Sequence, residues 1–370
     1  MQHLLSEEQI MFGDAIGRFV DAEYACAPRG VRPPDRARMR RLAELGAFAL
    51  NVPEALGGYG GAVETMVLHE RLAPALAPEP VLVTGSHAAA LIAAAAPDEV
   101  AGELLPKIAL GEIIVAVAHL EPGMIPYAAA PRATVRHDDG TVVLEGRKAL
   151  VPFGGDADVL LVSASDAAGR FVWIAVPRDT PGVTTTPAHR VDSLSAADIE
   201  LSACRLPAAA LLDRTEGLAA LRAADNIAEA AQVAEMVGLM SALVTATIDY
   251  VSTRQQFGVP IGSFQSLRHR IADMWMDCEE TRALAYAAAL ACTEAQERRA
   301  DAVSIAKLRA CDAADRVGAE AIQLHGAIGM TDEFIVSHWY RRLWALKLSL
   351  GDRATHLDRL AAPMRDFALV

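Results

Sequence analysis

Apolar residues recur at helical spacing through most of residues 6–112 and predict a helical segment. Ser6 and Gln9 have the spacing of a capping box, in which each side chain bonds to the backbone N–H of the other at a helix start. Asp35, directly after a proline, begins a second helix. The turn-rich stretch 52–61 interrupts the pattern, and helical spacing then returns. This part of the chain is therefore expected to be a set of short helices joined by turns.

The period changes to that of β-strands between about 113 and 215. Asp138-Asp139-Gly140 separates two strand-like runs and is a strong hairpin signal, because Asp and Gly readily adopt the backbone angles of a tight turn. The expected strands are 113–119, 134–137, 141–146, 159–163, 171–176, 182–186 and 198–201. They predict a small β domain, a barrel or a sandwich, inserted between helical regions.

Longer helices follow to the end of the chain. They are expected near 217–252, 263–297, 301–325, 334–349 and 353–368. Their lengths and short connections are typical of an antiparallel bundle. The predicted fold class is mostly α with an inserted β domain. The predicted domains are an N-terminal helical domain at 1–112, a middle β-barrel domain at 113–215 and a C-terminal four-helix bundle at 216–370.

The composition of the 370 residues is that of a globular protein, with 52% hydrophobic and 22% charged residues. The formal net charge is −13. This charge argues against a nucleic-acid partner, because a nucleic-acid-binding protein clusters Lys and Arg to replace counterions. An anionic small ligand would need local basic residues.

Other classes of site and location are also unfavoured. The five cysteines include no C-x-x-C pair, and no His, Cys or carboxylate cluster has metal-ligand spacing, so no metal site is expected. The N-terminal residues show no basic and apolar signal region. The most apolar stretch, around 87–97, is too short to span a bilayer. The sequence predicts a cytoplasmic protein without a membrane span.

One turn carries candidate ligand chemistry, and it begins at Arg254. A helix is expected to end there, because Gly258 and Pro260 cannot continue it. Ser263 is a candidate N-cap of the next helix. An Arg at such a turn can bind a phosphate or pyrophosphate through two parallel hydrogen bonds. An ordinary helix–loop–helix corner with a surface Arg has the same spacing.

This turn, Arg-x-x-Phe-Gly followed by Ile-Gly-x-Phe-Gln, resembles the flavin-contacting turn of the acyl-CoA dehydrogenase family. Four other segments resemble landmarks of that family in the family's order: 52–60, 105–112, 121–123 and 323–331. Together the five segments cover nearly the whole chain. The resemblance implies an acyl-CoA dehydrogenase-like fold, FAD as cofactor, an acyl-CoA substrate and an electron-transfer flavoprotein as electron acceptor. It also implies that C-terminal bundles associate and share the flavin across a subunit boundary.

The resemblance assigns the cofactor contacts residue by residue. Arg254 matches the Arg that reaches the FAD pyrophosphate, and Gln265 matches the Gln on the adenosine side. Gln323 belongs to a turn that meets FAD from the neighbouring subunit. Ala327 stands in this turn where the family has a glycine. The full set of implied cofactor-binding residues is Arg254, Gln256, Phe257, Gln265, His269, Gln323, Gly326 and Gly329. For His269 a purely structural role is the alternative interpretation.

The catalytic positions depart from the family pattern. The usual catalytic Glu falls on Leu350, and leucine cannot accept a proton. A minority of the family carries its base on the helix before Arg254, at the position of Ala228. The neighbouring Glu229 is therefore the candidate base, although one residue along a helix is a rotation of about 100°. Its alternative interpretation is a solvated helix face. Weaker candidates are Asp225, Glu235 and Asp352.

The middle domain departs as well. The segment 121–127 reads Glu-Pro-Gly-Met-Ile-Pro-Tyr where the family has Glu-Pro-x-x-Gly-Ser-Asp. The segment 148–153 reads Lys-Ala-Leu-Val-Pro-Phe where the family has Lys-x-x-Ile-Thr-Asn. The usual flavin-ring Trp and its hydroxyl-bearing partner are absent.

Two hypotheses follow from this selective loss. In the first, the chain is the base-lacking subunit of a heteromeric α2β2 acyl-CoA dehydrogenase, of the type that degrades steroid side chains or other bulky acyl-CoAs. A related partner then supplies the base and the substrate pocket, and this chain completes the FAD site. In the second, it is a self-sufficient dehydrogenase, or an oxidase or monooxygenase of the same fold, with Glu229 as base. A non-catalytic structural subunit is the extreme form of the first.

Overall fold

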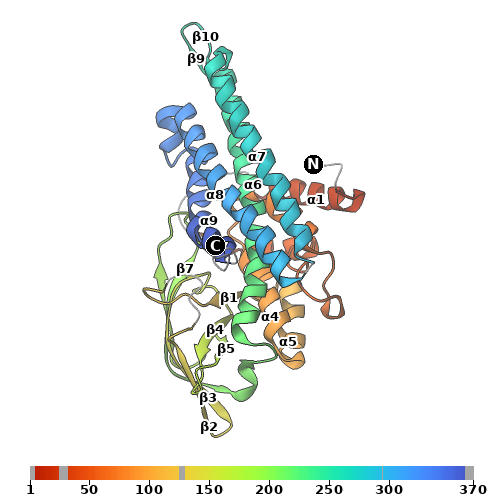
Figure 1. Cartoon of the computed structure of the whole chain (residues 1–370), viewed down its shortest axis with the longest axis vertical. Coiled ribbons are helices and arrows are strands. Elements are labelled where there is room, and N and C mark those ends of the chain that lie inside the picture. The colour runs from red at the N-terminus through yellow and green to blue at the C-terminus, as the bar shows by residue number, and fades with distance from the viewer. Residues whose placement is uncertain (1–4, 25–31, 125–129, 294, 363–370) are drawn as a thin grey trace, which may run out of the picture. The chain divides into compact units, whose positions relative to one another are not determined.

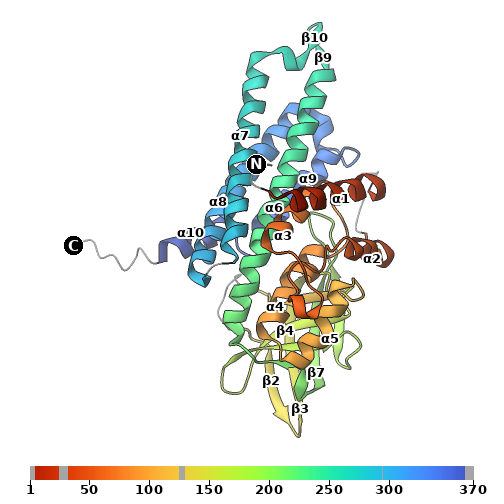
Figure 2. The same cartoon turned by 90° about the vertical axis from the view of Figure 1, so that its right-hand side faces the viewer.

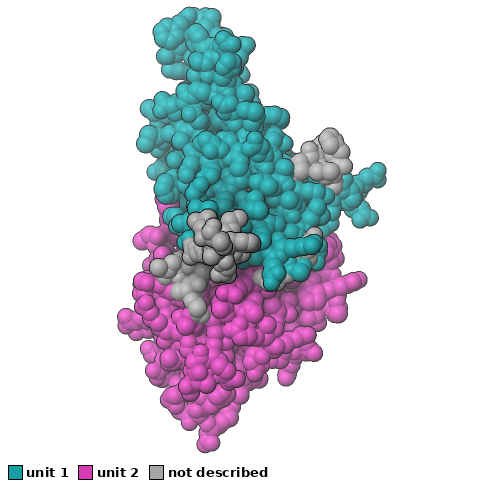
Figure 3. Space-filling model, in the orientation of Figure 1, with its two compact units in different colours: residues 1–30, 62–77, 229–370 teal, residues 31–61, 78–228 magenta. Residues whose placement is uncertain are grey.

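The structure, a computed structural model, describes residues 5–24, 32–124, 130–293 and 295–362. Contacts divide the chain into two compact units, each built from separate stretches of sequence (Figure 3). The helical unit comprises 1–30, 62–77 and 229–370, and the mixed unit comprises 31–61 and 78–228. These units group the chain differently from the three sequence ranges predicted above, and those ranges stay a prediction.

The helical unit is organised around long helices that run side by side (Figures 1 and 2). Its helices are α1 (Glu7–Glu23), α3 (Ala62–Leu72), most of α6 (Gly217–Thr253), α7 (Gln265–Ala291), α8 (Gln296–His325), α9 (Ile335–Leu348) and α10 (Arg353–Ala361). Short elements complete it: η3 (Ala73–Ala75), β9 (Gln255–Gln256), β10 (Val259–Pro260), η6 (Ile261–Ser263) and η7 (Gly326–Met330). The predicted capping box begins α1, since the Gln9 N–H donates to Ser6 Oγ at 3.2 Å and the Ser6 N–H donates to Gln9 Oε1 at 3.0 Å.

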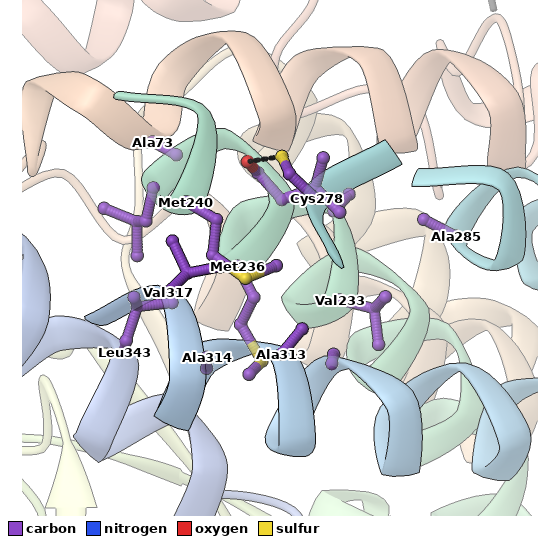
Figure 4. Close-up of a cluster of buried hydrophobic side chains, with 14 of the residues drawn as sticks. Ala73, Val233, Met236, Met240, Cys278, Ala285, Ala313, Ala314, Val317 and Leu343 are labelled. Atoms are coloured by element: carbon purple, nitrogen blue, oxygen red, sulfur yellow. Dashed lines mark hydrogen bonds between the residues drawn. The ribbon is translucent and has the colours of Figure 1, made fainter. Parts of the chain in front are cut away.

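The core of the helical unit lies between α6, α7, α8 and α9. Figure 4 shows Met236 and Met240 of α6 packed against residues of the neighbouring helices, Val317 among them. Small residues let the helices approach closely. A Cβ at Gly238 would lie 2.2 Å from the Glu70 carbonyl oxygen, so only glycine allows α3 and α6 this distance. The alanine-rich sequence is therefore suited to a tightly packed bundle.

The mixed unit combines short helices with one sheet. Its helices are α2 (Arg36–Glu44), η2 (Glu54–Leu56), the π-helix η4 (Val81–Ala88), α4 (Ala89–Ala95), α5 (Asp98–Ala109), η5 (Ala208–Ala210) and the first turns of α6. Its strands are β1 (Val115–Ala118), β2 (Thr134–Asp138), β3 (Thr141–Pro152), β4 (Val159–Ser165), β5 (Phe171–Pro177), β6 (Val183–Ala188), β7 (Ala196–Pro207) and β8 (Leu211–Leu212). Asp35 is the N-cap of α2, as predicted.

The eight strands pair in the order β6-β7-β3-β2-β4-β5-β8, with β1 parallel to β4. The predicted hairpin joins β2 to β3, with Asp138 opposite Thr141 and positive φ at Asp139 and Gly140. The Thr84 hydroxyl donates to the Val115 carbonyl at 3.0 Å and so ties η4 to β1. The predicted fold class, with a β region inserted between helical regions, is confirmed.

Helix α6 is also long and apolar enough to satisfy the length and composition of a membrane span, with a mean hydropathy of 1.5 over its most apolar window. However, 67% of that window is buried inside the protein, and a buried core helix meets the same criteria. The helix is therefore only weak evidence for a membrane span. The stretch 87–97, expected to be the most apolar, overlaps the shorter apolar helical segment Val81–Ala95.

Candidate functional site

The connection between α6 and α7 is an exposed hairpin at the end of these two helices (Figures 1 and 2). α6 ends at Thr253, as predicted. Phe257 and Gly258 lie at the hairpin tip with φ of 55° and 79°, which fits the type I′ turn that a two-residue hairpin favours. A phenylalanine in this conformation is strained, and Phe257 is 88% exposed. A strained, exposed aromatic residue at a tip is typical of a contact surface.

The polar residues predicted on this connection are all accessible. Arg254, Gln256, Gln265 and His269 are exposed. Ser263 is not the N-cap of α7, which is a correction of the sequence prediction. A single 3-10 turn intervenes, so Phe264 is the N-cap and the Ser263 hydroxyl donates to the Pro260 carbonyl at 2.8 Å.

The second predicted group lies at the end of α8. Gln323 is exposed in the last turn of the helix. Gly326 has a φ of 65° and a ψ of −146°, a conformation that favours glycine. Gly329 is buried, and a Cβ there would lie 2.9 Å from the Cβ of His325. Both glycines are therefore required by the local backbone.

His325, between Gln323 and Gly326, packs against the last turn of α6, just before Arg254 in the sequence. Its ring centroid lies 4.6 Å from that of Tyr250, which is in the last turn of α6, and 5.2 Å from that of Phe334. Its Nδ1 bonds to the Ala321 carbonyl at 2.8 Å. Sequence reasoning missed this residue, and its only signal was its place between Gln323 and Gly326.

The exposed groups fit the phosphate and adenosine parts of FAD. The Arg254 guanidinium has no hydrogen-bond or ion-pair partner within the described ranges of the chain. The same holds for the side-chain amides of Gln265 and Gln323. A free guanidinium can bind a pyrophosphate with two parallel bonds, and free amides can bond to a ribose or an adenine. The roles of these residues stay predictions.

The turn between α9 and α10 contains Leu350, with Asp352 close behind it. Leu350 has a φ of 55° and Gly351 a φ of 99°. Asp352 is the N-cap of α10, since its Oδ1 accepts from the Thr355 N–H at 2.9 Å. This bond and the one from the Thr355 hydroxyl lower the pKa of Asp352. A carboxylate so stabilised is a poor proton acceptor, which weakens Asp352 as a candidate base.

Glu229 is not on a solvated helix face, which corrects the alternative interpretation of that residue. Its side chain is fully buried, and its Oε2 lies 3.3 Å from Nη1 of Arg359 on α10. Ala228 beside it is also fully buried. Because α6 is a central helix with neighbours on most sides, two adjacent positions on it can both be buried by other helices.

The other two acidic candidates on α6 are likewise buried and paired. Asp225 Oδ1 lies 2.9 Å from Nε2 of His87. Glu235 accepts two hydrogen bonds from the Arg342 guanidinium, at 2.6 and 3.0 Å. Both carboxylates thus have a structural partner, which is the more common role of a buried acid.

The mixed unit contains a buried ion pair near the segment that departs from the family pattern. Lys148 Nζ lies 2.6 Å from Oε1 of Glu121, and both side chains are almost fully buried. Burial lowers the pKa of Lys148 to about 8. Val151 and Phe153, which follow on the same strand and turn, are buried and apolar. Residues 125–127 of the departing segment lie outside the described residues.

Comparison with known proteins covers nearly all of the chain. Three protein-family models match it: "Acyl-CoA dehydrogenase, N-terminal domain" at 6–112, "middle domain" at 116–204 and "C-terminal domain" at 215–364. The acyl-CoA dehydrogenase IpdE2 of Mycobacterium tuberculosis is 30% identical over 348 residues, which are 91% of each chain.

Two solved structures are similar over almost their full length. One is the ChsE4-ChsE5 complex from Mycobacterium tuberculosis, with a TM-score of 0.86, 25% identity and 98% coverage of both chains. The other is a glutaryl-coenzyme A dehydrogenase in complex with glutaryl-CoA, with a TM-score of 0.91, 25% identity and coverage of 98% of this chain and 96% of that one.

Proposed function

Because the chain belongs to the acyl-CoA dehydrogenase family, we propose that it is the base-lacking subunit of a heteromeric dehydrogenase. Enzymes of this family are FAD-dependent oxidoreductases that act on CH–CH bonds of acyl-CoA thioesters. Bound FAD supplies the acceptor for the hydride that leaves the β-carbon. In the proposed assembly a related partner supplies the carboxylate that removes the α-proton, and this chain completes the FAD site.

Leu350 carries this proposal. The resemblance gives its position to the catalytic Glu, and a leucine has no group that can take a proton. The cofactor turns, by contrast, keep Arg254, whose guanidinium has no partner among the residues that the structure describes, and Gly326 with the backbone that needs glycine. A subunit whose partner performs the proton transfer can lose its own base, but it has to keep the groups that bind the cofactor.

The comparisons support a two-chain assembly without assigning this chain to one. The ChsE4-ChsE5 structure is a complex of two different proteins. We expect an acyl-CoA as substrate, a related dehydrogenase chain as partner, an electron-transfer flavoprotein as electron acceptor and a cytoplasmic location. A bulky acyl group, such as a steroid side chain, is the substrate class that fits the first hypothesis.

An anaerobic titration with acyl-CoAs tests the proposal. The flavin absorbance is followed for the purified chain alone and for the chain together with the related protein encoded beside it. We expect full flavin content and bleaching only in the mixture. Bleaching of a homo-oligomer of this chain, with a full complement of FAD, would refute the proposal.

The self-sufficient enzyme with Glu229 as base is the second candidate. A Glu229→Gln variant separates the two. Under our proposal the variant loses a structural ion pair with Arg359, so the free energy of unfolding falls by about 1–3 kcal/mol and turnover of the assembly is unchanged once folded. Abolished turnover with FAD still bound would instead identify Glu229 as the base.

A further inference from the structure

Three aromatic rings of the helical unit pack together where α6 ends, α8 ends and α9 begins. The ring centroid of His325, the last residue of α8, lies 4.6 Å from that of Tyr250 at an interplanar angle of 31°. It lies 5.2 Å from that of Phe334 at an angle of 52°. Ring pairs at these distances attract each other beyond the effect of the area that they bury. The imidazole of His325 therefore joins two segments from different parts of the chain.

The imidazole acts through its faces. A carbonyl oxygen only accepts hydrogen bonds, so the 2.8 Å bond to the Ala321 carbonyl places a proton on Nδ1 of His325 and fixes the ring against its own helix. The other nitrogen, Nε2, is inaccessible to solvent and has no hydrogen-bond partner among the described residues. A covered nitrogen cannot bond to a bound molecule, so what the ring offers is a fixed stacking surface.

On one side this stack is connected to Arg254. The Tyr250 carbonyl accepts from the Arg254 N–H at 2.8 Å, which closes the end of α6. The Arg254 carbonyl in turn accepts from the Ile261 N–H at 2.8 Å, at the base of the exposed hairpin. A shift of the Tyr250 ring would therefore be transmitted through the last turn of α6 to the backbone of Arg254.

On the other side the stack is connected to the turn that follows α8. A Cβ at Gly329 would lie 2.9 Å from the Cβ of His325, so only a glycine lets the turn fold back onto the histidine. The Thr331 carbonyl, just past this turn, accepts from the Ser337 hydroxyl of α9 at 2.8 Å. The path of the turn that carries the second predicted cofactor group is thus set by contacts with His325 and α9.

We infer that His325 is a positioning residue for FAD, whose ring fixes the place of Arg254 relative to Gln323. This inference rests on the proposed function, in which these two residues bind the cofactor. Both are exposed and available to a ligand. Groups that are already in place bind a ligand more tightly, because ordering them during binding costs free energy. The affinity for FAD should therefore depend on a ring that does not touch it.

The affinity of the folded protein for FAD tests this role. The full chain, assembled with its partner chain if flavin binding needs one, is freed of flavin and titrated with FAD by equilibrium dialysis. We expect His325→Leu and Tyr250→Leu each to weaken FAD binding by about three- to tenfold. The double variant should weaken it no further, because either change already breaks the stack. His325→Phe keeps a stacking ring and should remain within about twofold of the wild type.

The matched control is His69→Leu. His69 of α3 is as buried as His325, at 3% exposure each, and its loss should lower the thermal midpoint without changing the affinity for FAD. Circular dichroism establishes that each variant is folded. Tyr250 is only partly buried, so Tyr250→Leu keeps the test open if His325→Leu does not fold.

The outcomes separate this inference from the function on which it rests. If the Leu variants lower the thermal midpoint as His69→Leu does and leave the affinity for FAD unchanged, the ring has only a structural role and the inference is refuted. Additive effects of the two Leu variants, or a loss in His325→Phe as large as that in His325→Leu, would also overturn it. An unchanged affinity in Arg254→Gln would instead refute the predicted cofactor site. Failure of the wild-type assembly to bind FAD would refute the proposed function.

Discussion

Arg254 and Arg359 have the same side chain and opposite situations. Arg254 is exposed and its guanidinium has no partner among the described residues, whereas Arg359 is paired with the fully buried Glu229. A free guanidinium is available to a ligand, and a paired one stabilises a buried charge. The difference fits the predicted role of Arg254 in ligand binding and gives Arg359 a structural role.

Replacing Arg254 by Gln should therefore weaken FAD binding with little effect on folding. Loss of a charge-assisted hydrogen bond corresponds to about 1.5–3 kcal/mol, or roughly 10- to 100-fold in the dissociation constant. Flavin content after dialysis measures the effect. Arg353→Gln is the control, since Arg353 is an exposed arginine that pairs with Asp312. Equal flavin loss in both variants would contradict the assignment of Arg254.

The sequence could identify Arg254 but not the environment of Glu229. Arg254 follows a helix and precedes Gly258 and Pro260, so its place in a turn is readable from neighbouring residues. Burial of Glu229 depends on Arg359, which is 130 residues away in the sequence. A single sequence contains no signal for such a pairing, and the ordinary exposure of glutamate pointed to the wrong environment.

At the scale of elements, the turn between α9 and α10 depends on one buried lysine. Lys307 of α8 is completely buried and donates to Gln232 Oε1 at 2.6 Å, to the Leu346 carbonyl at 2.7 Å and to the Ser349 carbonyl at 3.2 Å. The Leu346 carbonyl, which also accepts from the Ser349 N–H at 3.3 Å, lies in the last turn of α9, and Ser349 is the residue that follows the helix. The lysine thus fixes the backbone that leads into Leu350.

Lys307→Met should destabilise the protein strongly. The variant keeps the volume of the side chain but removes three hydrogen bonds from the interior, so we expect the free energy of unfolding to fall by about 3–5 kcal/mol. Urea denaturation measures this loss. Lys107→Met, at a half-exposed lysine of α5 that pairs with Glu103 on the surface, should change it by less than about 0.5 kcal/mol. A small effect at Lys307 would show that the turn has other supports.

Elements were more predictable from sequence than their ends and distortions. The hairpin at Asp139 and Gly140 and the start of α2 at Asp35 were predicted, because turn and cap residues act locally. The 3-10 turn that displaces the start of α7 from Ser263 and the π-helix η4 were not. The π-helix η4 is largely buried, so its geometry depends on packing that local propensity does not encode. The turn at η6 contains no buried residue, and its start at Ile261 was not readable from Ser263 alone.

At the scale of the whole molecule, buried histidines make stability depend on pH. Burial lowers the pKa of His69 to about 4, of His119 to about 4 and of His356 to about 3, from an ordinary value of 6.5. Between about pH 6.5 and 4 the unfolded chain binds protons that the native protein does not. The free energy of unfolding should therefore fall as the pH falls through this window.

Urea denaturation at a series of pH values between about 7 and 4 checks this dependence. His356→Asn should reduce the slope, because it removes one of the three groups, whereas His137→Asn at an exposed site should not. Carboxyl groups with lowered pKa, such as Glu121 and Asp277, also reduce the free energy of unfolding as the pH falls. They do so only near and below their ordinary pKa values of 4.5 and 3.8. A profile that is flat from pH 7 to 5 would contradict the burial of these histidines in neutral form.

The division of the chain into two interleaved units has a consequence for biosynthesis. The chain passes between the units at residues 30–31, 61–62, 77–78 and 228–229, so neither unit is a continuous stretch. Helices α1 and α3 leave the ribosome early, yet α7 and the later part of α6, against which α3 packs, are translated long after them. Their apolar faces must wait for most of the polypeptide to be made, which is the situation in which nascent chains need chaperones. For the same reason no single cut would release either unit as an intact fragment.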